Sequence, residues 1–226
     1  MDNRLFLFLT IILLAFGCKK DKLLPSDVGY DYFPVEIGKW VVYDVDSIVY
    51  NDFTNEIDSF HFQIKELIES SFVDAEGREV QRLHRYKRRD VGDTWTIKDV
   101  WSIVKTNKTA ERFEENVMYV KLSFPARIGQ SWDGNAANVY DEWMYQCTEY
   151  DEEYMLGNLL FDSTLTVLQR DENLGIEKDY FIEVYAKHVG LVYKQSIHLE
   201  QDFIDPTWSN PKKGFVYTMK GISYGN

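Results

Sequence analysis

Apolar and polar residues alternate along most of the chain with a period of two. In the segment "FHFQIKELI" (60–68), Phe60, Phe62 and Ile64 share one face, and the residues between them share the other. The same alternation recurs in segments 95–103, 118–124 and 191–199. This period predicts β-strands with one buried face, as in antiparallel sheets whose other face meets water.

Turn sequences separate these runs. "DAEG" (74–77), "DENLG" (171–175) and "DPTWSNPKKG" (205–214) combine glycine with aspartate, asparagine or proline, which favour turns. We therefore predict an all-β fold, a curved antiparallel meander of about ten strands that forms a barrel, half-barrel or sandwich. Helical spacing is scarce, so at most one short helix is expected, near "EEYMLGNLL" (152–160).

One short phrase occurs twice, as "FPVEIGKW" (33–40) and "FPARIGQSW" (124–132). Its proline lacks an N–H and suits the entry to a strand. Gly38 and Gly129 permit a backbone conformation that other residues rarely adopt. The phrase therefore predicts a corner that starts a strand, with its Phe and Trp packing into the core on either side. The sequences after the two phrases differ, which favours one device used twice over a duplicated domain.

The N-terminus carries a short apolar run, "LFLFLTIILLAF" (5–16). At about 1.5 Å per residue it makes a helix of roughly 18 Å, too short for a bilayer core of about 30 Å, so it is typical of a signal peptide. Small residues precede Cys18, which predicts cleavage before that cysteine and lipid attachment to it. Ordinary secretion, with Cys18 as a plain terminal thiol, is the alternative.

The predicted organisation is a signal peptide (1–17), a lipidated cysteine with a tether (18–29) and a single β domain (30–226). Cys147 is the second of two cysteines in the chain. With Cys18 acylated it has no partner. In the run "VYDEWMYQC" (139–147) it shares a face with Val139, Trp143 and Tyr145, which predicts a buried, inert thiol.

Acidic residues outnumber basic ones, 37 to 25, for a net charge of −12. This balance argues against nucleic acid and acidic membrane surfaces as partners. The exception is "RLHRYKRR" (82–89). This run is expected to be a solvated strand face. The alternative is a docking patch for an anionic partner, with Arg85, Lys87, Arg88 and Arg89 as contacts.

Motifs for chemistry are scarce. The four histidines are scattered, and the chain has no GxSxG, Ser-x-x-Lys or phosphate-loop sequence. We therefore predict no catalytic residue, metal or cofactor; a hydrolase with spatially paired carboxylates stays open, because such pairing is not visible in sequence. Trp208 lies in a polar loop. It is a candidate surface contact, or else a plug folded onto the end of a barrel.

Two phrases are similar to those of a known class of protein. "YFPVEIGKWVVYDVD" (32–46) resembles the opening of many Bacteroidota lipoproteins, and "YAKHVGLVYKQ" (185–195) resembles a phrase they carry near the C-terminus. The resemblance implies a β domain anchored in the outer membrane of the bacterial envelope through lipid on Cys18. It implies no chemistry, so no catalytic residue follows from it.

These observations favour a non-enzymatic envelope lipoprotein that acts as an interaction or assembly module with an envelope protein partner. The alternatives are a carrier that holds an apolar ligand inside the curved sheet and, third, a hydrolase. Bulky side chains expected inside the sheet predict a filled interior, with function on the outer surface at loops such as 205–214. Those side chains are Phe60, Phe62, Trp95, Trp101, Tyr119, Trp143, Tyr145 and Tyr193.

Overall fold

The computed structural model describes residues 27–226, which form a single antiparallel sheet of twelve strands. The predicted signal peptide and Cys18 lie outside the described residues. The strands are β1 (Trp40–Asn51), β2 (Glu56–Val73), β3 (Glu79–Arg88), β4 (Thr96–Lys105), β5 (Thr109–Glu114), β6 (Val117–Ser123), β7 (Ser131–Asp133), β8 (Met144–Leu156), β9 (Leu159–Asn173), β10 (Glu177–Ala186), β11 (Gly190–Glu200) and β12 (Lys213–Gly225). Helical structure within residues 27–226 is confined to one 3-10 turn, η2 (Tyr30–Tyr32), and no helix there has the length and apolar character needed to cross a membrane.

The sheet is a meander that nearly closes on itself. Its order is β6-β5-β4-β3-β2-β1-β12-β11-β10-β9-β8-β7, so two runs of six strands meet where β1 pairs with β12. At the other seam the Val120 N–H donates to the Gly134 carbonyl at 2.9 Å, and Trp132 Nε1 donates to the Val120 carbonyl at 2.9 Å. The prediction of a curved all-β meander is confirmed, as a nearly closed barrel with two more strands than expected.

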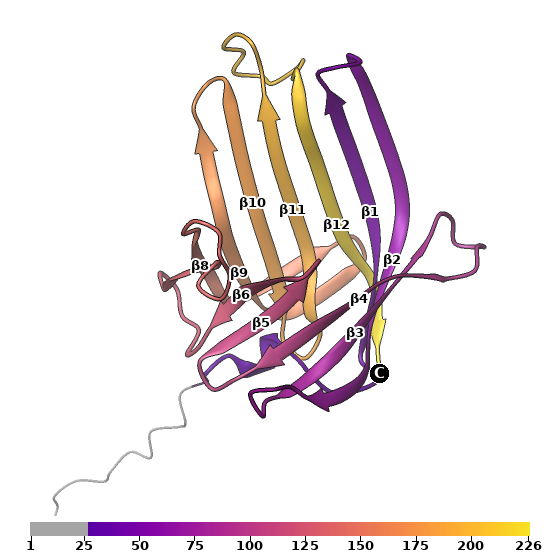
Figure 1. The fold of residues 1–226 in the computed structure, drawn as a ribbon, viewed down its shortest axis with the longest axis vertical. Helices are drawn as coiled ribbons and strands as arrows, with labels where there is room; N and C mark the ends of the chain where they lie inside the picture. Colours follow the sequence, from indigo (N-terminus) through magenta and orange to yellow (C-terminus); the bar gives the residue numbers. More distant parts are fainter. Residues whose placement is uncertain (1–26) are drawn as a thin grey trace, which may run out of the picture.

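Strand length divides the barrel into two ends. In Figure 1, β10, β11, β12, β1 and β2 rise together to the upper end, whereas β3 to β6 cross only the lower part. β2 has 18 residues, whereas β5 has 6 and β7 has 3. We call the lower part the closed end and the upper part the open end.

The N-terminal segment seals the closed end. It runs beneath the barrel in Figure 1 and is fastened to three different parts of the wall. The Ala126 N–H donates to the Val28 carbonyl at 2.9 Å, and the His188 N–H donates to the Asp31 carbonyl at 2.8 Å. Tyr32 is fully buried, and its hydroxyl lies 2.8 Å from that of Ser163. The main core packs behind this plug and includes Tyr43, Val45, Ile64, Leu122, Leu165, Val167 and Tyr185.

The repeated phrase makes the same corner in both places. Gly38 (φ 97°) and Gly129 (φ 79°) have positive φ, as predicted. Each is the third residue of a four-residue turn, which is closed by a hydrogen bond from the Lys39 N–H to the Glu36 carbonyl in the first corner and from the Gln130 N–H to the Arg127 carbonyl in the second. In the first corner the Gly38 N–H donates to the Ile68 carbonyl at 2.8 Å, and the Ile68 N–H donates to the Lys39 carbonyl at 2.9 Å. In the second corner the Gly129 N–H donates to the Cys147 carbonyl at 2.8 Å, and the Cys147 N–H donates to the Gln130 carbonyl at 2.9 Å. The corners thus start β1 and β7, the first strands of the two six-strand runs.

The aromatic residues of the corners bury unequally. Phe33 and Phe124 are buried in the core, whereas Trp40 and Trp132 are only partly buried. Trp132 packs against the main core, and the Trp40 ring contacts the Lys65 ammonium at 5.1 Å. The expectation that both tryptophans fill the core is therefore right for Trp132 alone.

The short helix expected at 152–160 is not formed. The segment ends β8, turns at Gly157 (φ 59°), and begins β9, with Leu156 paired to Leu159 across a two-residue loop. The strand alternation lets Tyr154 and Phe161 pack on a second small cluster with Val184 and Val192. Burial of this alternating face favours a strand over a helix.

Candidate functional site

A hollow of about 700 Å³ lies on the concave face of the sheet at the open end. Much of its wall is aromatic or aliphatic, contributed by Val49, Phe62, Ile64, Trp101, Phe181, Phe215, Tyr217 and Met219. These residues come from β1, β2, β4, β10 and β12, and the long strands carry most of the wall past the end of the short ones. The barrel therefore encloses its core at one end and leaves a concave apolar surface at the other.

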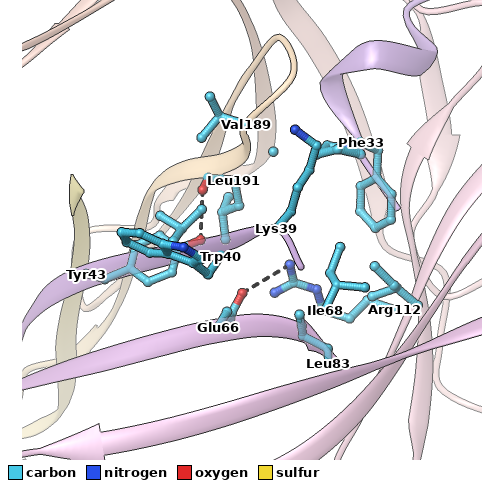
Figure 2. A pocket seen from close by; sticks show the side chains of 14 residues that line it. Phe33, Lys39, Trp40, Tyr43, Glu66, Ile68, Leu83, Arg112, Val189 and Leu191 are labelled. Carbon is cyan, nitrogen blue, oxygen red and sulfur yellow. Dashed lines mark hydrogen bonds and ion pairs between the residues drawn. The ribbon is translucent and has the colours of Figure 1, made fainter. Parts of the chain in front are cut away.

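A smaller cavity at the closed end shows the contrast. Figure 2 shows its lining, which includes Phe33, Trp40, Tyr43 and Leu191, and its volume is about 50 Å³. The Tyr43 hydroxyl donates to the Leu191 carbonyl at 2.8 Å across it. A space of this size holds one or a few waters at most. The predicted filled interior is thus right for the closed end and wrong for the open end.

Contacts and exposure locate six of the eight bulky residues expected inside the sheet. Phe62 and Trp101 line the hollow, Trp143 and Tyr145 pack against the main core, Tyr193 packs on the second cluster, and Phe60 is 52% exposed. Phe60 is exposed because β2 has no partner on the β3 side before Gln63. The lost neighbour strand, and not the residue type, leaves space at this end.

The polar part of the hollow is mainly basic. Its charged or titratable side chains are Arg85, Lys98, Arg112, Lys194, Lys213 and His198, with Glu66 as the carboxylate among them. This lining contrasts with the net charge of −12 of the whole chain. The hollow is therefore a basic site inside an acidic protein.

Four of these bases, Arg85, Lys98, Arg112 and Lys194, belong to a continuous run of ion pairs, which we call the interior charge chain. Arg85 bridges two of its acids, with Nε donating to Glu66 and Nη1 to Asp99, both at 2.9 Å. Its guanidinium also lies 3.6 Å from the centre of the Trp101 ring, a cation–π contact. The chain in order is Lys98, Asp99, Arg85, Glu66, Arg112, Glu114, Lys121, Glu183 and Lys194.

The part of the interior charge chain from Lys121 to Glu183 is the most deeply buried. Lys121 Nζ donates to Glu183 at 2.7 Å, Lys194 lies 3.1 Å from the same carboxylate, and the Tyr185 hydroxyl donates to it at 2.6 Å. Burial alone raises the pKa of Glu183, but the two lysines overcome this and hold the pKa well below its usual range. The pKa of Glu114 is also lowered: burial raises it, but the positive charges of Lys121, Lys194 and Arg112 together lower it by more.

The centre of the chain is less complete. Burial lowers the pKa of Arg112, and Glu66 and Glu114 more than offset this, so the guanidinium stays charged. Arg112 Nε and Glu114 Oε1 face each other at 4.0 Å, and neither has a hydrogen-bond partner among the described residues. Arg112 and Glu66 line both cavities, so together they form the floor of the hollow.

These electrostatics bear on the hydrolase alternative. A glycosidase-type general acid needs a carboxyl group whose pKa is raised. The pKa values of Glu183 and Glu114 are lowered instead, because each faces two or more bases. Glu183 and Glu114 are therefore held as anions that keep the neighbouring bases in place.

The predicted basic patch is divided by the strand alternation. Arg85 is 6% exposed and points into the barrel, and Lys87 Nζ lies 3.9 Å from the centre of the Phe62 ring, on the side of the hollow. Arg88 hydrogen-bonds to Gln63 and stacks on Trp95, and Arg89 is largely exposed. The four residues do not form one surface patch, since successive side chains of a strand point to opposite faces.

Trp208 is buried, with an exposed fraction of 9%, so its ring is not a surface contact. The Asp205 carboxylate accepts hydrogen bonds from Thr207 and Ser209 and shapes the loop, in which Trp208 adopts a φ of 52°. The polar neighbours that suggested an exposed loop are instead those that direct the ring inward.

Cys147 is a buried free thiol, as predicted. Burial raises its pKa to about 11. Tyr145 shares its buried environment, but Val139 is 98% exposed, because residues 134–143 form a loop before β8. The face assigned from sequence is therefore right from Trp143 onward and wrong at Val139.

The sequence did not reveal one cluster of possible metal ligands. Glu177, Asp179 and His198 place ligand atoms within 4.8 Å of one another, because Asp179 and His198 are paired across β10 and β11. Two of the three residues are already engaged: His198 Nδ1 lies 2.7 Å from Asp179, and Arg170 donates to Asp179 at 3.0 Å. The contacts describe an ion-pair cluster at the rim of the hollow.

The interior lysines were also missed. In "LVYKQSIHL" (191–199) Lys194, Ser196 and His198 are the polar half of the alternation, the half that ordinarily faces solvent, yet all three line the hollow. The alternation holds from Tyr193 onward, but a bulge at Val192 places Leu191 in the main core and Tyr193 on the second cluster. Both faces of β11 are covered, one by the hollow and one by the second cluster with Val192, so the pattern alone could not tell inside from outside.

Two solved structures are similar to this chain. One is a protein of Bacteroides fragilis NCTC 9343, provisionally described as exported and as having a YmcC-like fold; identity is 10%, the match covers 86% of this chain and 98% of that chain, and the TM-score is 0.44. The other is a protein of Parabacteroides distasonis ATCC 8503, provisionally described as a lipoprotein, with 11% identity, the same coverages of 86% and 98%, and a TM-score of 0.34. At values this low neither assigns a family or function. No protein-family model matches the chain, and neither does a curated protein.

Proposed function

We propose that this protein is a non-enzymatic lipoprotein of the bacterial envelope, anchored in the outer membrane through lipid on Cys18, that holds an amphipathic ligand in the hollow. The hollow carries the proposal. Its volume of about 700 Å³ falls within the range of roughly 300–1,000 Å³ that is usual for small-molecule sites. Aromatic walls with a few placed charges are also typical of such sites. The carrier function thereby moves ahead of the interaction module.

An apolar rim beside the hollow favours a second role, as a docking module for an envelope protein. Phe53, Phe203 and Ile204 are between 70% and 95% exposed. They lie in the β1–β2 turn and the β11–β12 loop, and Ile204 also contacts the β9–β10 turn beside Gly175. Clustered exposed apolar side chains often mark partner surfaces. In this proposal the rim is where a partner receives or delivers the ligand.

The hollow is tested by filling it. In the chain that begins at residue 19, which keeps every strand and core residue described above, Ser47→Trp places a large ring against the wall of the hollow. The matched control is Ser59→Trp, on the neighbouring strand at an exposed position. Titration with a neutral apolar fluorophore should show saturable binding to the wild type and Ser59→Trp, and at least tenfold weaker binding to Ser47→Trp. Equal binding by all three would remove the hollow as the site.

The anchor is tested separately. Metabolic labelling with a palmitate analogue should mark the wild-type protein and leave Cys18→Ala unlabelled, because Cys18 is the residue that follows the predicted cleavage site. Cys147→Ala is the matched control and should label as the wild type does. Labelling of Cys18→Ala would show that the lipid is attached elsewhere and overturn the assignment.

A further inference from the structure

The interior charge chain has an unequal number of bases and acids. It alternates strictly over nine side chains, five basic and four acidic, and it begins and ends with a lysine. The two terminal residues, Lys98 and Lys194, both line the hollow. An alternating chain of odd length cannot neutralise itself, so one positive charge remains on its members.

The excess charge is directed toward the hollow. Among the nine members, Lys98, Arg85, Arg112 and Lys194 line the hollow, whereas the single carboxylate in the lining, Glu66, already pairs with both arginines. The other acids, Asp99, Glu114 and Glu183, are outside the lining and hold the bases from behind. A ligand in the hollow therefore contacts mainly bases, and most of the acids lie behind those bases.

The terminal lysines are the most accessible members of this wall. The side chain of Lys98 is 39% exposed and that of Lys194 is 24% exposed, whereas those of Arg85 and Arg112 are below 10%. Glu183 keeps its contact with Lys121 at 2.7 Å whatever Lys194 does. Lys194 can thus form an ion pair with a ligand while Glu183 remains paired with Lys121.

Within the hollow, the arginines of the interior charge chain lie toward the floor and the apolar wall extends past them, with Lys213 and His198 at the rim. Arg112 and Glu66 form the floor, next to the small cavity, whereas Val49 and Phe215 lie farther along β1 and β12 toward the open end. Phe62 and Phe181 complete the apolar wall. An elongated molecule fits this arrangement with a charged head at the floor and an apolar tail toward the rim.

We infer that the ligand is an amphiphile with a singly charged anionic head and an acyl-type tail, its head on Lys194, Lys98 and the arginines of the floor, and its tail along Phe62, Phe181 and Phe215. This inference rests on the proposed function and narrows its ligand class. One negative charge balances the one excess positive charge of the interior charge chain. The acidic surface of the rest of the protein keeps anions from binding elsewhere.

The test compares two probes that differ only in the head group, hexadecanoate and hexadecanol. Binding to the chain that begins at residue 19 is followed by the fluorescence of its tryptophans, of which Trp101 lies in the wall. The wild type should bind hexadecanoate at least tenfold more tightly than hexadecanol, since a hydrogen bond to a charged group contributes about a factor of ten or more.

The variants separate the charge chain from the general field. Lys98→Met combined with Lys194→Met keeps the unbranched stem of both side chains without the charge, and should abolish the preference for the acid while leaving hexadecanol binding unchanged. Lys213→Met is the matched control, because Lys213 also lines the hollow but pairs with Glu200 outside the charge chain. It should keep most of the preference. Melting temperatures confirm that each variant folds.

The outcomes are distinct. Equal binding of the two probes by the wild type would overturn the anionic head and leave the hollow as an apolar site. Loss of preference in Lys213→Met as large as in the double variant would assign the effect to overall charge and not to the charge chain. Binding of neither probe would contradict the proposed function itself, and this inference with it.

Discussion

The closed and open ends of the barrel share their long strands and are built from the same kinds of residue, yet one is packed and the other hollow. The cavity at the closed end measures about 50 Å³ and the one at the open end about 700 Å³. Aromatic residues line both, such as Tyr43 in the first and Tyr217 in the second. The closed end has the full ring of strands and the N-terminal plug, whereas only the long strands reach the open end. Strand length, and not composition, therefore decides which part of the interior is filled.

The largest expected effect tests the charged part of the packed region. Glu183→Ala leaves Lys121 buried at 4% side-chain exposure with only Glu114, at 3.9 Å, beside it. We expect a loss of about 3–5 kcal/mol in the free energy of unfolding, the usual cost of breaking a buried pair by removing one partner. Urea denaturation measures it.

The control for this prediction is Glu172→Ala, which removes a carboxylate 3.8 Å from Arg170 at the surface, with 57% side-chain exposure. Exposed pairs of this kind contribute roughly 0–1 kcal/mol. If both variants unfold at the same urea concentration, the interior charge chain does not stabilise the closed end.

The second prediction compares apolar truncations at the two ends. Leu165→Ala, at 1% exposure in the main core, should cost about 2–5 kcal/mol because it leaves a cavity. Phe215→Ala removes a larger side chain from the wall of the hollow, where space already exists, and should cost less than about 2 kcal/mol. Thermal denaturation of the two variants gives the order. A costlier Phe215→Ala would mean that the open end is packed as tightly as the closed end.

The third prediction concerns the two corners. Gly129→Val and Gly38→Val should each cost about 1–3 kcal/mol, from backbone strain alone, because an added Cβ meets no atom within 4 Å at either site. Gln130→Val is the control, since it adds a branched residue one position later, where φ is not positive. Equal melting temperatures for Gly129→Val and Gln130→Val would contradict the role of the glycine.

The smallest effect is a pH dependence at the rim of the hollow. Burial lowers the pKa of His198, but hydrogen bonds to Asp179 and Glu200 raise it by more, so the net shift is upward. A raised pKa in the folded state stabilises the protein below the usual value of about 6.5, and this contribution is lost as the pH rises through the folded-state pKa. The wild type should therefore be slightly more stable, relative to His198→Gln, at pH 6 than at pH 9, by urea denaturation at both values. A constant difference would show that the ion-pair cluster adds no stability.

Local features of the fold could be predicted from the sequence because they depend on neighbouring residues. The period of two identifies strands such as β2 and β11, and the phrase around Gly38 and Gly129 identifies two corners with positive φ. The burial of Cys147 follows from the same alternation. Each of these depends on backbone geometry within a few residues.

The site could not be predicted, because it depends on where strands end relative to one another. Phe60 and Phe62 belong to the same face of β2, yet one is exposed and the other lines the hollow. Lys194 is on a face that alternation suggested to be wet, and Glu183 meets Lys121 only through the closure of the barrel. A single sequence shows which residues share a face but not which face points inward.

The plug at the closed end also fixes the end of the barrel at which the chain enters. Chain entry is pinned there by Val28 and Asp31, opposite the hollow. With lipid on Cys18, the nine residues 18–26 reach at most about 30 Å, while the twelve residues of β1 alone extend about 40 Å away from the entry point. If the proposed lipid is attached to Cys18, the reach of residues 18–26 is shorter than the wall of the barrel, and we expect the open end to face away from the bilayer. In that arrangement the proposed ligand would enter and leave the hollow through the aqueous compartment or from a facing surface.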